Sequence, residues 1–284
     1  MIVVVGGTGR VGRQVAAQLR ERDLPVKVVT RGLNPSGAPP GAEVAHADLA
    51  DPASLEPYLP GAQALFLVWP FTSPETTVGL APKVAEIAAR HAGRIVYLSA
   101  QAAADQPASF WATMERLIEA SGAQWTFLRP TGFAANTLMW ADQIRAHGAV
   151  RWPYGAAARS LIHERDIAAV AVAALTDARH VGQKYLLTGP EVITQAEQVE
   201  VIGDVIGRGV RWAELAPEEA RQQLLAAWGD PGFVDSALAT WAGLVAHPEP
   251  VTGTVREITG TPARSFRQWA ADHAGDFRPL PEAG

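Results

Sequence analysis

The fold of this chain is decided by Ile2-Val3-Val4-Val5-Gly6-Gly7-Thr8-Gly9-Arg10-Val11-Gly12. A short β-branched run before a glycine cluster is typical of a buried parallel strand that turns sharply into a helix. Gly7, Gly9 and Gly12 have the G-x-G-x-x-G spacing of a dinucleotide-binding turn. In such a turn the first glycine permits the tight bend, the second lets backbone N–H groups approach a pyrophosphate, and the third lets helix and strand pack closely. The stretch therefore predicts a nucleotide site at the N-terminus of a helix over Val11–Arg22.

The composition excludes several classes of function. The chain has 284 residues, a formal charge of −5, three lysines and no basic run, which argues against nucleic acid as a partner. It has no cysteine, so disulfides, thiol catalysis and thiolate metal sites are excluded. No spacing typical of a metal site occurs. No apolar stretch is long enough to cross a bilayer and no signal peptide fits, so we expect a cytoplasmic protein that does not bind a membrane.

Strand-like runs alternate with helical patterns, which is typical of βαβ units and a parallel sheet. The runs are Ile2–Val5, Val26–Thr30, Glu43–His46, Ala64–Val68, Arg94–Leu98, Trp125–Leu128 and Lys184–Leu187. The helical patterns are Val11–Arg22, Pro52–Leu59, Glu75–His91, Phe110–Ser121 and Ile167–Thr176. After Gly189 the pattern is mostly helical, near Thr194–Ile206, Pro217–Trp228, Phe233–Val245 and Pro262–His273.

We therefore expect an α/β fold: a Rossmann doubly wound parallel sheet with a smaller, mainly helical C-terminal substrate lobe. The nucleotide-binding core would comprise residues 1–132, with 163–190 returning to it. The substrate lobe would comprise residues 133–162 and 191–284. Ligands of such sheets bind at the carboxyl ends of the strands, so the segments that follow the strands are the ones that carry chemistry.

The end of the second strand indicates which cofactor is preferred. NAD-selective folds place an acidic residue there for the ribose 2′-hydroxyl, whereas this chain has Arg31. A guanidinium is suited to a phosphate, so we predict NADP(H) over NAD(H), with Arg31 on the 2′-phosphate and Arg10 assisting. The alternative is that Arg31 is a solvated loop charge. The candidate cofactor contacts are Gly6, Thr8, Gly9, Arg10, Val11, Gly12, Arg31, Asp48, Leu49, Trp69, Ser99 and Pro130.

Two aspartates follow the third strand. Asp48 could accept a hydrogen bond from the adenine amino group, or it could cap the helix that begins at Pro52. For Asp51, which directly precedes that proline, capping is the favoured interpretation.

The motifs together resemble the NmrA-like, atypical branch of the short-chain dehydrogenase/reductase superfamily. The resemblance is carried by Gly6–Gly12, Thr30-Arg31, Ala47-Asp48-Leu49, Tyr97-Leu98-Ser99, Met114–Gly122, Thr126–Phe133, Asp166-Ile167-Ala168 and Tyr185–Glu191. It implies a Rossmann domain with a smaller substrate lobe. Known relatives include NADPH-dependent quinone, azo-dye and triphenylmethane-dye reductases, and also nucleotide-sensing regulators that perform no catalysis.

The catalytic pair of the main short-chain group is absent. That group uses Tyr-x-x-x-Lys on a helix, where the lysine lowers the tyrosine pKa. None of the four tyrosines is followed by lysine four residues later. Aligned on Glu115 and Ser121-Gly122, the two positions hold Trp111 and Glu115, and several quinone-reducing relatives have His where Trp111 stands. Indole is not a useful acid at neutral pH, so the tyrosine mechanism is not available.

Ser99, Glu115 and Trp111 remain as candidate catalytic residues. Ser99 ends the fifth strand, where it either donates a hydrogen bond to the reacting carbonyl or satisfies the strand end. Glu115 either acts as an acid or base, if buried, or pairs with Arg116 or Arg129 in a structural network.

The nine tryptophans suggest a flat apolar pocket. A quinone or extended conjugated acceptor delocalises the arriving charge, so the site needs mainly stacking and orientation. The candidate substrate contacts are Trp69, Phe71, Trp111, Phe133, Asn136, Trp140, Trp152 and His163. The alternative is that these aromatic residues fill a core, as we expect for Trp125, Trp228, Trp241 and Trp269.

The sequence thus predicts an NADP(H)-dependent oxidoreductase of the atypical short-chain type that acts on a bulky planar quinone- or enone-like substrate. One alternative is a non-catalytic NADP(H)-binding redox sensor. Another is a redox-neutral isomerase, cyclase or dehydratase of secondary metabolism. We expect a monomer or homodimer whose partner is an aromatic or conjugated small molecule.

Overall fold

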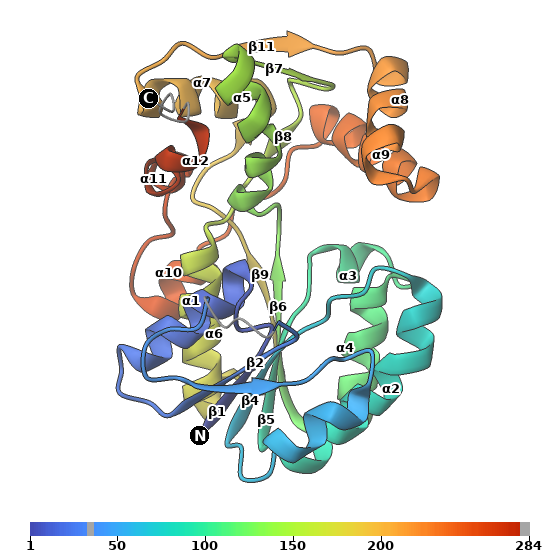
Figure 1. Ribbon diagram of the computed structural model, residues 1–284, viewed down its shortest axis with the longest axis vertical. Coiled ribbons are helices and arrows are strands. Elements are labelled where there is room, and N and C mark those ends of the chain that lie inside the picture. Colours follow the sequence, from blue (N-terminus) through green and yellow to red (C-terminus); the bar gives the residue numbers. More distant parts are fainter. Residues whose placement is uncertain (33–36, 279–284) are drawn as a thin grey trace. The chain divides into compact units, whose positions relative to one another are not determined.

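The computed structural model describes residues 1–32 and 37–278, which form two compact units (Figure 1). Unit 1 comprises Met1–Pro130, Glu164–Leu187 and Thr254–Thr261. Unit 2 comprises Thr131–His163, Thr188–Gly253 and the described residues from Pro262 onward. The predicted bounds of the nucleotide-binding core did not include Thr254–Thr261, which packs against a helix of unit 1.

Unit 1 is built on a seven-stranded parallel sheet in the order β3-β2-β1-β4-β5-β6-β9. The strands are β1 (Ile2–Val5), β2 (Val26–Thr30), β3 (Glu43–His46), β4 (Ala64–Val68), β5 (Arg94–Leu98), β6 (Gln124–Pro130) and β9 (Gln183–Leu187). Strands that are covered on both faces have continuous apolar runs, so the predicted bounds of these strands lie close to the observed ones. The prediction of a doubly wound α/β fold is confirmed.

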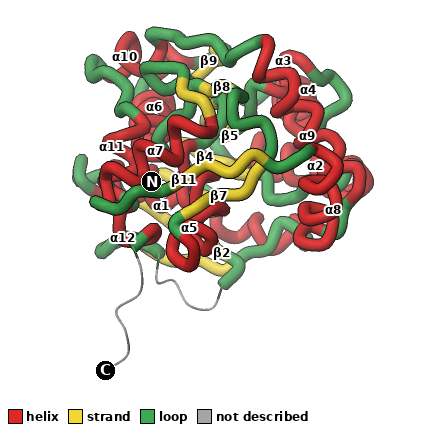
Figure 2. Tube along the Cα trace, turned by 90° about the horizontal axis from the view of Figure 1, so that it is seen from above, coloured by secondary structure: helices red, strands yellow, loops and turns green. Residues whose placement is uncertain are grey.

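Helices cover both faces of this sheet (Figures 1 and 2). On one face α1 (Arg10–Arg20) packs against α6 (Glu164–Thr176), and α10 (Thr254–Thr259) packs against α6 in turn. On the other face lie η1 (Pro52–Tyr58), α2 (Pro74–His91) and α4 (Phe110–Ala120), with the short α3 (Ala102–Asp105) beside α4. A further short helix, η3 (Ala178–His180), precedes β9. The η1 segment is a 3-10 helix that contains Pro57, which lacks the N–H that an α-helix requires.

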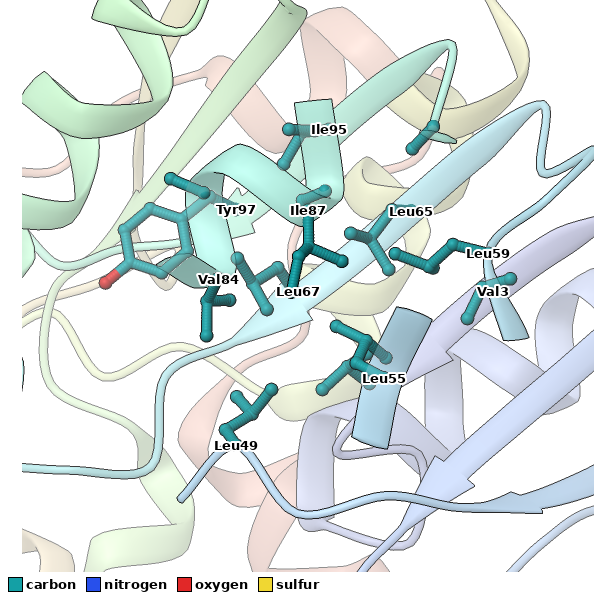
Figure 3. Packing of buried hydrophobic residues seen from close by; sticks show 14 of the residues in the cluster. Val3, Leu49, Leu55, Leu59, Leu65, Leu67, Val84, Ile87, Ile95 and Tyr97 are labelled. Atoms are coloured by element: carbon teal, nitrogen blue, oxygen red, sulfur yellow. The ribbon is translucent and has the colours of Figure 1, made fainter. Parts of the chain in front are cut away.

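The main core of unit 1 lies between the sheet and the layer formed by η1, α2 and α4. Figure 3 shows side chains from β1, β4, β5, η1, α2 and the loops on either side of η1 packed together there. The labelled residues are Val3, Leu49, Leu55, Leu59, Leu65, Leu67, Val84, Ile87, Ile95 and Tyr97. All ten are buried, and this packing fixes the carboxyl ends of β4 and β5.

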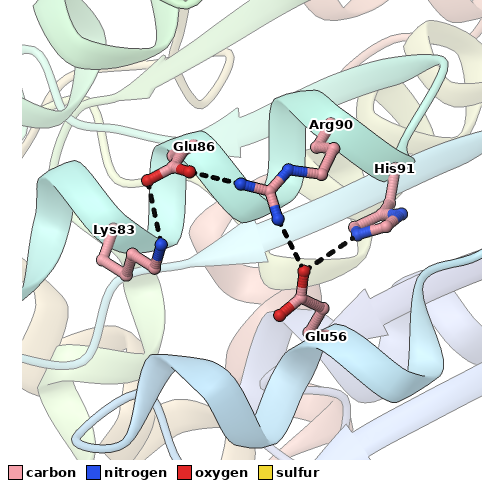
Figure 4. Close-up of polar contacts among 5 residues, drawn as sticks. All are labelled: Glu56, Lys83, Glu86, Arg90 and His91. Atoms are coloured by element: carbon pink, nitrogen blue, oxygen red, sulfur yellow. Dashed lines mark hydrogen bonds and ion pairs between the residues drawn. The ribbon is translucent and has the colours of Figure 1, made fainter.

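A polar network on the surface joins η1 to α2 (Figure 4). Glu56 accepts from Arg90 Nη1 at 2.8 Å and contacts His91 Nε2 at 3.2 Å. The hydrogen bond with His91 is the main cause that lowers the pKa of the Glu56 carboxyl. Glu86 pairs with Lys83 and Arg90 on the same helix. Exposed pairs of this kind contribute little stability, so the buried core, and not this network, is the main source of stability between η1 and α2.

Unit 2 is mainly helical, as predicted. Its helices are η2 (Ala134–Trp140), α5 (Ala141–His147), α7 (Gln195–Ile206), α8 (Pro217–Trp228), α9 (Pro231–Ala246), α11 (Phe266–Asp272) and α12 (Ala274–Phe277). Two small sheets accompany them: β7 (Ala149–Trp152) with β11 (Arg211–Glu214) in parallel, and β8 (Ala158–Arg159) with β10 (Ile193–Thr194) antiparallel. The sequence did not predict these four strands: β8 and β10 have two residues each, and β7 and β11 interrupt their apolar residues with charged ones.

Tyr97 contains a buried hydroxyl that no described residue satisfies with a hydrogen bond. Burial, and then the charge of Glu115, raise the pKa of this phenol. An unsatisfied buried hydroxyl costs about 1–3 kcal/mol, so Tyr97→Phe should raise the free energy of unfolding. Tyr185→Phe is the matched control, because its hydroxyl bonds His180 Nδ1 at 2.8 Å. That change should cost about 0.5–1.5 kcal/mol.

Urea titrations with an unchanged m-value would measure both effects. A loss of stability in Tyr97→Phe would contradict the assignment of an unsatisfied hydroxyl.

Candidate functional site

The turn between β1 and α1 is held closed by backbone hydrogen bonds. The Gly6 N–H donates to the Val29 carbonyl at 3.1 Å, and the Gly9 N–H donates to the Gly6 carbonyl at 2.9 Å. Gly6 has a φ of +76°, in the left-handed region that glycine adopts without strain. The residue that permits the tight bend is therefore Gly6, one position earlier than the G-x-G-x-x-G spacing predicted.

Gly12 and Gly7 are required because neighbouring atoms lie too close to leave room for a side chain. A Cβ on Gly12 would lie 2.2 Å from the Gly6 carbonyl oxygen, and a Cβ on Gly7 would lie 2.6 Å from Val28 Cγ1. Gly9 is the N-cap of α1, and no side chain among the described residues caps that helix. The first N–H groups of an α-helix have no partner within the helix and point to its N-terminal end. A dinucleotide pyrophosphate fits this cradle.

The end of β2 adds hydroxyls and a cation to the same turn. The Oγ1 atoms of Thr8 and Thr30 lie 3.1 Å apart, and the Gly32 N–H donates to Thr30 Oγ1 at 3.2 Å. Arg31 follows with an exposed side chain, and Arg10 is exposed at the start of α1. The structure therefore places the threonine pair, which the sequence did not pair, beside the two arginines that it did select.

The two aspartates after β3 do not cap η1 with their side chains. Asp51 occupies the N-cap position but makes no side-chain cap hydrogen bond within the described residues, so the capping prediction is wrong. Ser54 Oγ donates to the Asp48 and Asp51 carbonyls instead, at 3.0 and 2.6 Å. Asp48 Oδ1 accepts from the Ala50 N–H at 3.0 Å, which closes a tight turn before the helix.

Several of the residues predicted to contact the cofactor or the substrate are mainly core residues. Trp69 is only 6% exposed; its indole N–H donates to Thr77 Oγ1 at 3.1 Å, and its ring packs edge-on against Phe71 at 5.0 Å. Leu49 is buried in the main core. Pro130 is the buried last residue of β6, and its carbonyl accepts from the Gln101 N–H. Trp111 is half-buried against the neighbouring Phe110 ring.

Ser99 and Glu115 are joined in a buried network. Ser99 Oγ donates to Glu115 Oε1 at 2.6 Å, and both side chains are nearly fully buried. Arg129 binds the same carboxylate with two groups, Nε at 2.9 Å and Nη2 at 2.5 Å. Lys184 Nζ lies 4.0 Å from Glu115 and 2.7 Å from Glu119. Of the partners weighed from the sequence, Arg129 is the one that Glu115 binds, whereas Arg116 reaches the Pro107 carbonyl and Thr113.

This arrangement reverses the charge pattern of the Tyr-x-x-x-Lys pair. A carboxylate stands at the helix position of the lysine, and cations reach it from β6 and β9. Glu115 in turn raises the pKa of Arg129, chiefly through the hydrogen bonds between them. Sequence reasoning missed Lys184 because β9 pairs with β6 across a long stretch of chain, which places Lys184 beside Phe127. The Ser99 proton is committed to a carboxylate that is itself paired.

Unit 2 brings three of the predicted substrate contacts together. Phe133, Asn136 and Trp140 line one small pocket. Trp152 is not part of the lining but packs against Trp140 with ring centroids 6.2 Å apart. His163 is buried, and its Nε2 lies 3.3 Å from Asp272 Oδ2.

Neither a metal site nor a membrane span is found in the part of the chain that the structure describes. No group of three or more His, Asp or Glu side chains could hold a metal ion. No helix there has the length and apolar character needed to cross a bilayer.

The glycine turn and the parallel sheet define a dinucleotide-binding α/β protein of the Rossmann class. A model of the NmrA-like family matches residues 1–240. The (4-alkanoyl-5-oxo-2,5-dihydrofuran-3-yl)methyl phosphate reductase of Streptomyces griseus subsp. griseus is 40% identical, over 98% of this chain and 100% of that protein. The NAD(P)H azoreductase of Xenophilus azovorans is 34% identical, over 98% of this chain and 99% of that protein.

Among solved structures, the NADPH-dependent quinone oxidoreductase of Escherichia coli, complexed with NADPH, is similar in fold. Its TM-score is 0.80 at 23% identity, covering 96% of this chain and 99% of that one. The chain belongs to the NmrA-like family, whose model matches most of its length. The predictions of this family and of a reductase are confirmed.

The glycine turn can be tested with two Gly→Ala changes. Gly12→Ala would place a Cβ 2.2 Å from a backbone oxygen, so α1 has to move and nucleotide affinity should be lost. Gly79→Ala is the control, because Gly79 lies in α2 with nothing within 4 Å of the added Cβ. That control should gain about 0.5–1 kcal/mol of stability and keep its affinity.

Calorimetric titration of NADPH and thermal unfolding would measure both variants. Wild-type affinity in a folded Gly12→Ala protein would contradict the assignment of this turn to the pyrophosphate.

Proposed function

We propose that the chain is an NADPH-dependent reductase of a carbon–carbon double bond conjugated to carbonyl groups. The observation that carries the proposal is the commitment of the Ser99 proton to Glu115, whose carboxylate is bound by Arg129. None of these three groups is a free acid that could protonate a substrate oxygen. A substrate that stores negative charge by conjugation does not require such an acid.

The atoms and electrons of the proposed reaction balance although no side chain of the protein supplies the proton. NADPH, when bound, supplies a hydride and becomes NADP⁺. The hydride forms a C–H bond at the β-carbon of the substrate, and the electron pair of the double bond delocalises onto the conjugated carbonyl oxygen. Solvent then protonates the α-carbon, which gives the saturated carbonyl compound. The task of the chain is to hold the cofactor and to orient the substrate.

The Streptomyces griseus relative supports this substrate class. Its name describes a 2,5-dihydrofuran ring with an oxo group and an alkanoyl group, so the ring double bond is conjugated to two carbonyls. The relationship extends over 98% of this chain at 40% identity. The enone-like substrate that the sequence predicted is therefore favoured over a quinone. Of the predicted catalytic residues, we propose Ser99 and Glu115 as positioning residues and not as acids.

The cofactor is held by the cradle at the start of α1. The N–H groups of the first turn would bind the pyrophosphate, and Gly7 and Gly12 let the backbone approach it. Arg31 would bind the 2′-phosphate, since its planar guanidinium is exposed at the end of β2 where an acidic residue would favour NAD. We therefore propose that NADPH is preferred over NADH.

Arg31→Gln tests the cofactor preference. A charge-assisted hydrogen bond contributes about 1.5–3 kcal/mol, so the KM for NADPH should rise roughly 10- to 100-fold while that for NADH stays the same. Arg22→Gln is the control, because it removes the same charge at the opposite end of α1. Steady-state kinetics with both cofactors would measure the effect. A parallel rise in both KM values would contradict a role on the 2′-phosphate.

That Ser99, Glu115 and Arg129 offer no free acid predicts a sharp preference among substrates. General acid catalysis contributes about 10²–10⁴-fold, so a simple ketone should be reduced more slowly than a conjugated enone by a factor in that range. Ser99→Ala should lower kcat on the enone by less than about tenfold, since Ser99 does not supply the proton. NADPH absorbance at saturating cofactor would follow both reactions.

Efficient reduction of the ketone would require an acid that the proposal excludes. Binding of NADPH without turnover of any acceptor would favour the alternative of a non-catalytic NADP(H)-binding redox sensor.

A further inference from the structure

Thr30, the last residue of β2 in unit 1, is buried on the face of the strand that meets the glycine turn. Successive side chains of a strand alternate between the two faces, so Thr30 lies on the same face as Val28. Val28 packs directly against the glycine turn, because a Cβ on Gly7 would lie 2.6 Å from its Cγ1. The strand therefore carries the Thr30 hydroxyl to the turn that we assign to the pyrophosphate.

The Thr30 hydroxyl closes a turn around Arg31. The Gly32 N–H donates to Thr30 Oγ1 at 3.2 Å. A side-chain oxygen that accepts from the N–H two residues further on takes the place of a backbone carbonyl in a turn, and it restrains the backbone of the residue between them. That residue is Arg31, whose side chain is exposed. The hydroxyl thereby limits the directions in which the guanidinium can leave the end of β2.

The same hydroxyl also contacts the glycine turn. Thr30 Oγ1 lies 3.1 Å from Thr8 Oγ1, and either hydroxyl can donate. A hydroxyl has one donor and two acceptor sites, so Thr30 can share this hydrogen bond and accept from Gly32 at the same time. Thr8 is itself in close contact with Gly37, where a Cβ would lie 3.1 Å from the Thr8 carbonyl oxygen and 3.3 Å from Thr8 Cβ. The side chain of Thr30 therefore joins the turn around Arg31 to the glycine turn.

The glycine turn has backbone hydrogen bonds of its own. The Gly6 and Gly7 N–H groups donate to the Val29 carbonyl at 3.1 and 3.4 Å. Removal of the Thr30 hydroxyl would leave these bonds in place and would release mainly the turn around Arg31. The pyrophosphate site serves NADPH and NADH alike, whereas only NADPH carries a 2′-phosphate. Binding of NADPH should therefore depend on this hydroxyl more than binding of NADH.

We propose that Thr30 is a positioning residue for NADP(H) selectivity, whose hydroxyl holds the guanidinium of Arg31 at a fixed place relative to the glycine turn. The inference rests on the proposed function, in which Arg31 binds the 2′-phosphate and the glycine turn binds the pyrophosphate. One NADPH molecule carries both groups, so two sites at a fixed separation can bind it together. A binding group that is ordered in advance loses less conformational freedom on binding and therefore binds more tightly.

Thr30→Val tests this role, because valine keeps the β-branched shape and replaces the hydroxyl by a methyl group. The loss of the hydrogen bonds of this hydroxyl should weaken NADPH binding about 3- to 10-fold and leave NADH binding unchanged. Thr30→Ser keeps the hydroxyl and should restore most of the NADPH affinity. Calorimetric titration of the full-length protein with each cofactor measures these affinities. Thr30→Ala removes the same hydroxyl and gives the answer where the valine variant does not fold.

Thr126→Val is the matched control. Thr126 is also a buried strand threonine, and its Oγ1 donates to the His180 carbonyl at 2.7 Å. It lies in the N-terminal half of β6, away from the carboxyl ends of the strands, where we place the cofactor. Loss of this hydrogen bond should lower the thermal stability of the protein but leave its affinities for both cofactors unchanged.

A double-mutant cycle with Arg31→Gln shows whether Thr30 acts through Arg31. Without the guanidinium, the position of the turn no longer matters to the 2′-phosphate. Thr30→Val should therefore cause no further loss of NADPH affinity in the Arg31→Gln protein. Equal weakening of NADPH and NADH by Thr30→Val, or a full additional loss in the Arg31→Gln protein, would overturn the inference. So would wild-type affinity for NADPH in the Thr30→Val protein.

Arg31→Gln alone separates a failure of this inference from a failure of the proposed cofactor preference. If Arg31→Gln weakens NADPH binding and not NADH binding, and Thr30→Val changes neither, the assignment of the 2′-phosphate stands and the role of Thr30 does not. If Arg31→Gln leaves NADPH binding unchanged, the assignment of Arg31 fails, and the role of Thr30 fails with it. Neither result depends on whether an enone is reduced.

Discussion

The packing of Gly12 against the Gly6 carbonyl is the constraint on which the nucleotide site depends. At 2.2 Å from a Cβ to that oxygen, no side chain fits, so only glycine lets α1 start directly above the end of β1. Glycine inside a helix costs about 1 kcal/mol relative to alanine, and the chain accepts that cost at the position where the helix meets the strand. The same approach aims the first-turn N–H groups at the carboxyl edge of the sheet. The position of α1 also determines the helix layer on the other face of the sheet, because α6 packs against α1 there.

Glu115 is the second determinant of what the site can do. In the tyrosine mechanism a cation on this helix makes a phenol acidic, whereas here a carboxylate on the helix accepts the hydrogen bond of the Ser99 hydroxyl. Burying a carboxylate with Arg129 is not by itself a gain in stability, because desolvation offsets much of the attraction. The pair instead fixes Ser99 in one hydrogen-bonded state. A site built this way can orient a substrate but cannot readily protonate it, which limits it to acceptors that stabilise their own charge.

The sequence predicted the sheet better than the details of the site. The strands of unit 1 were located because their apolar runs are continuous, and α2 and α4 because their faces are amphipathic. The segment that begins at Pro52 was predicted as a plain helix but is a 3-10 helix, and at its start the side chain of Ser54, and not that of Asp51, forms the hydrogen bonds. Lys184 could not be linked to Glu115, since that contact depends on the pairing of β6 with β9.

The aromatic residues show why composition alone did not separate a pocket from a core. Trp69 and Trp140 are both nearly buried, yet Trp69 donates to Thr77 whereas Trp140 has no acceptor in the described part of the chain. Trp152 Nε1 is unpartnered there as well, although Trp152 does not line the small pocket and Trp140 does. The distinction depends on where the fold places each ring, which no count of tryptophans contains.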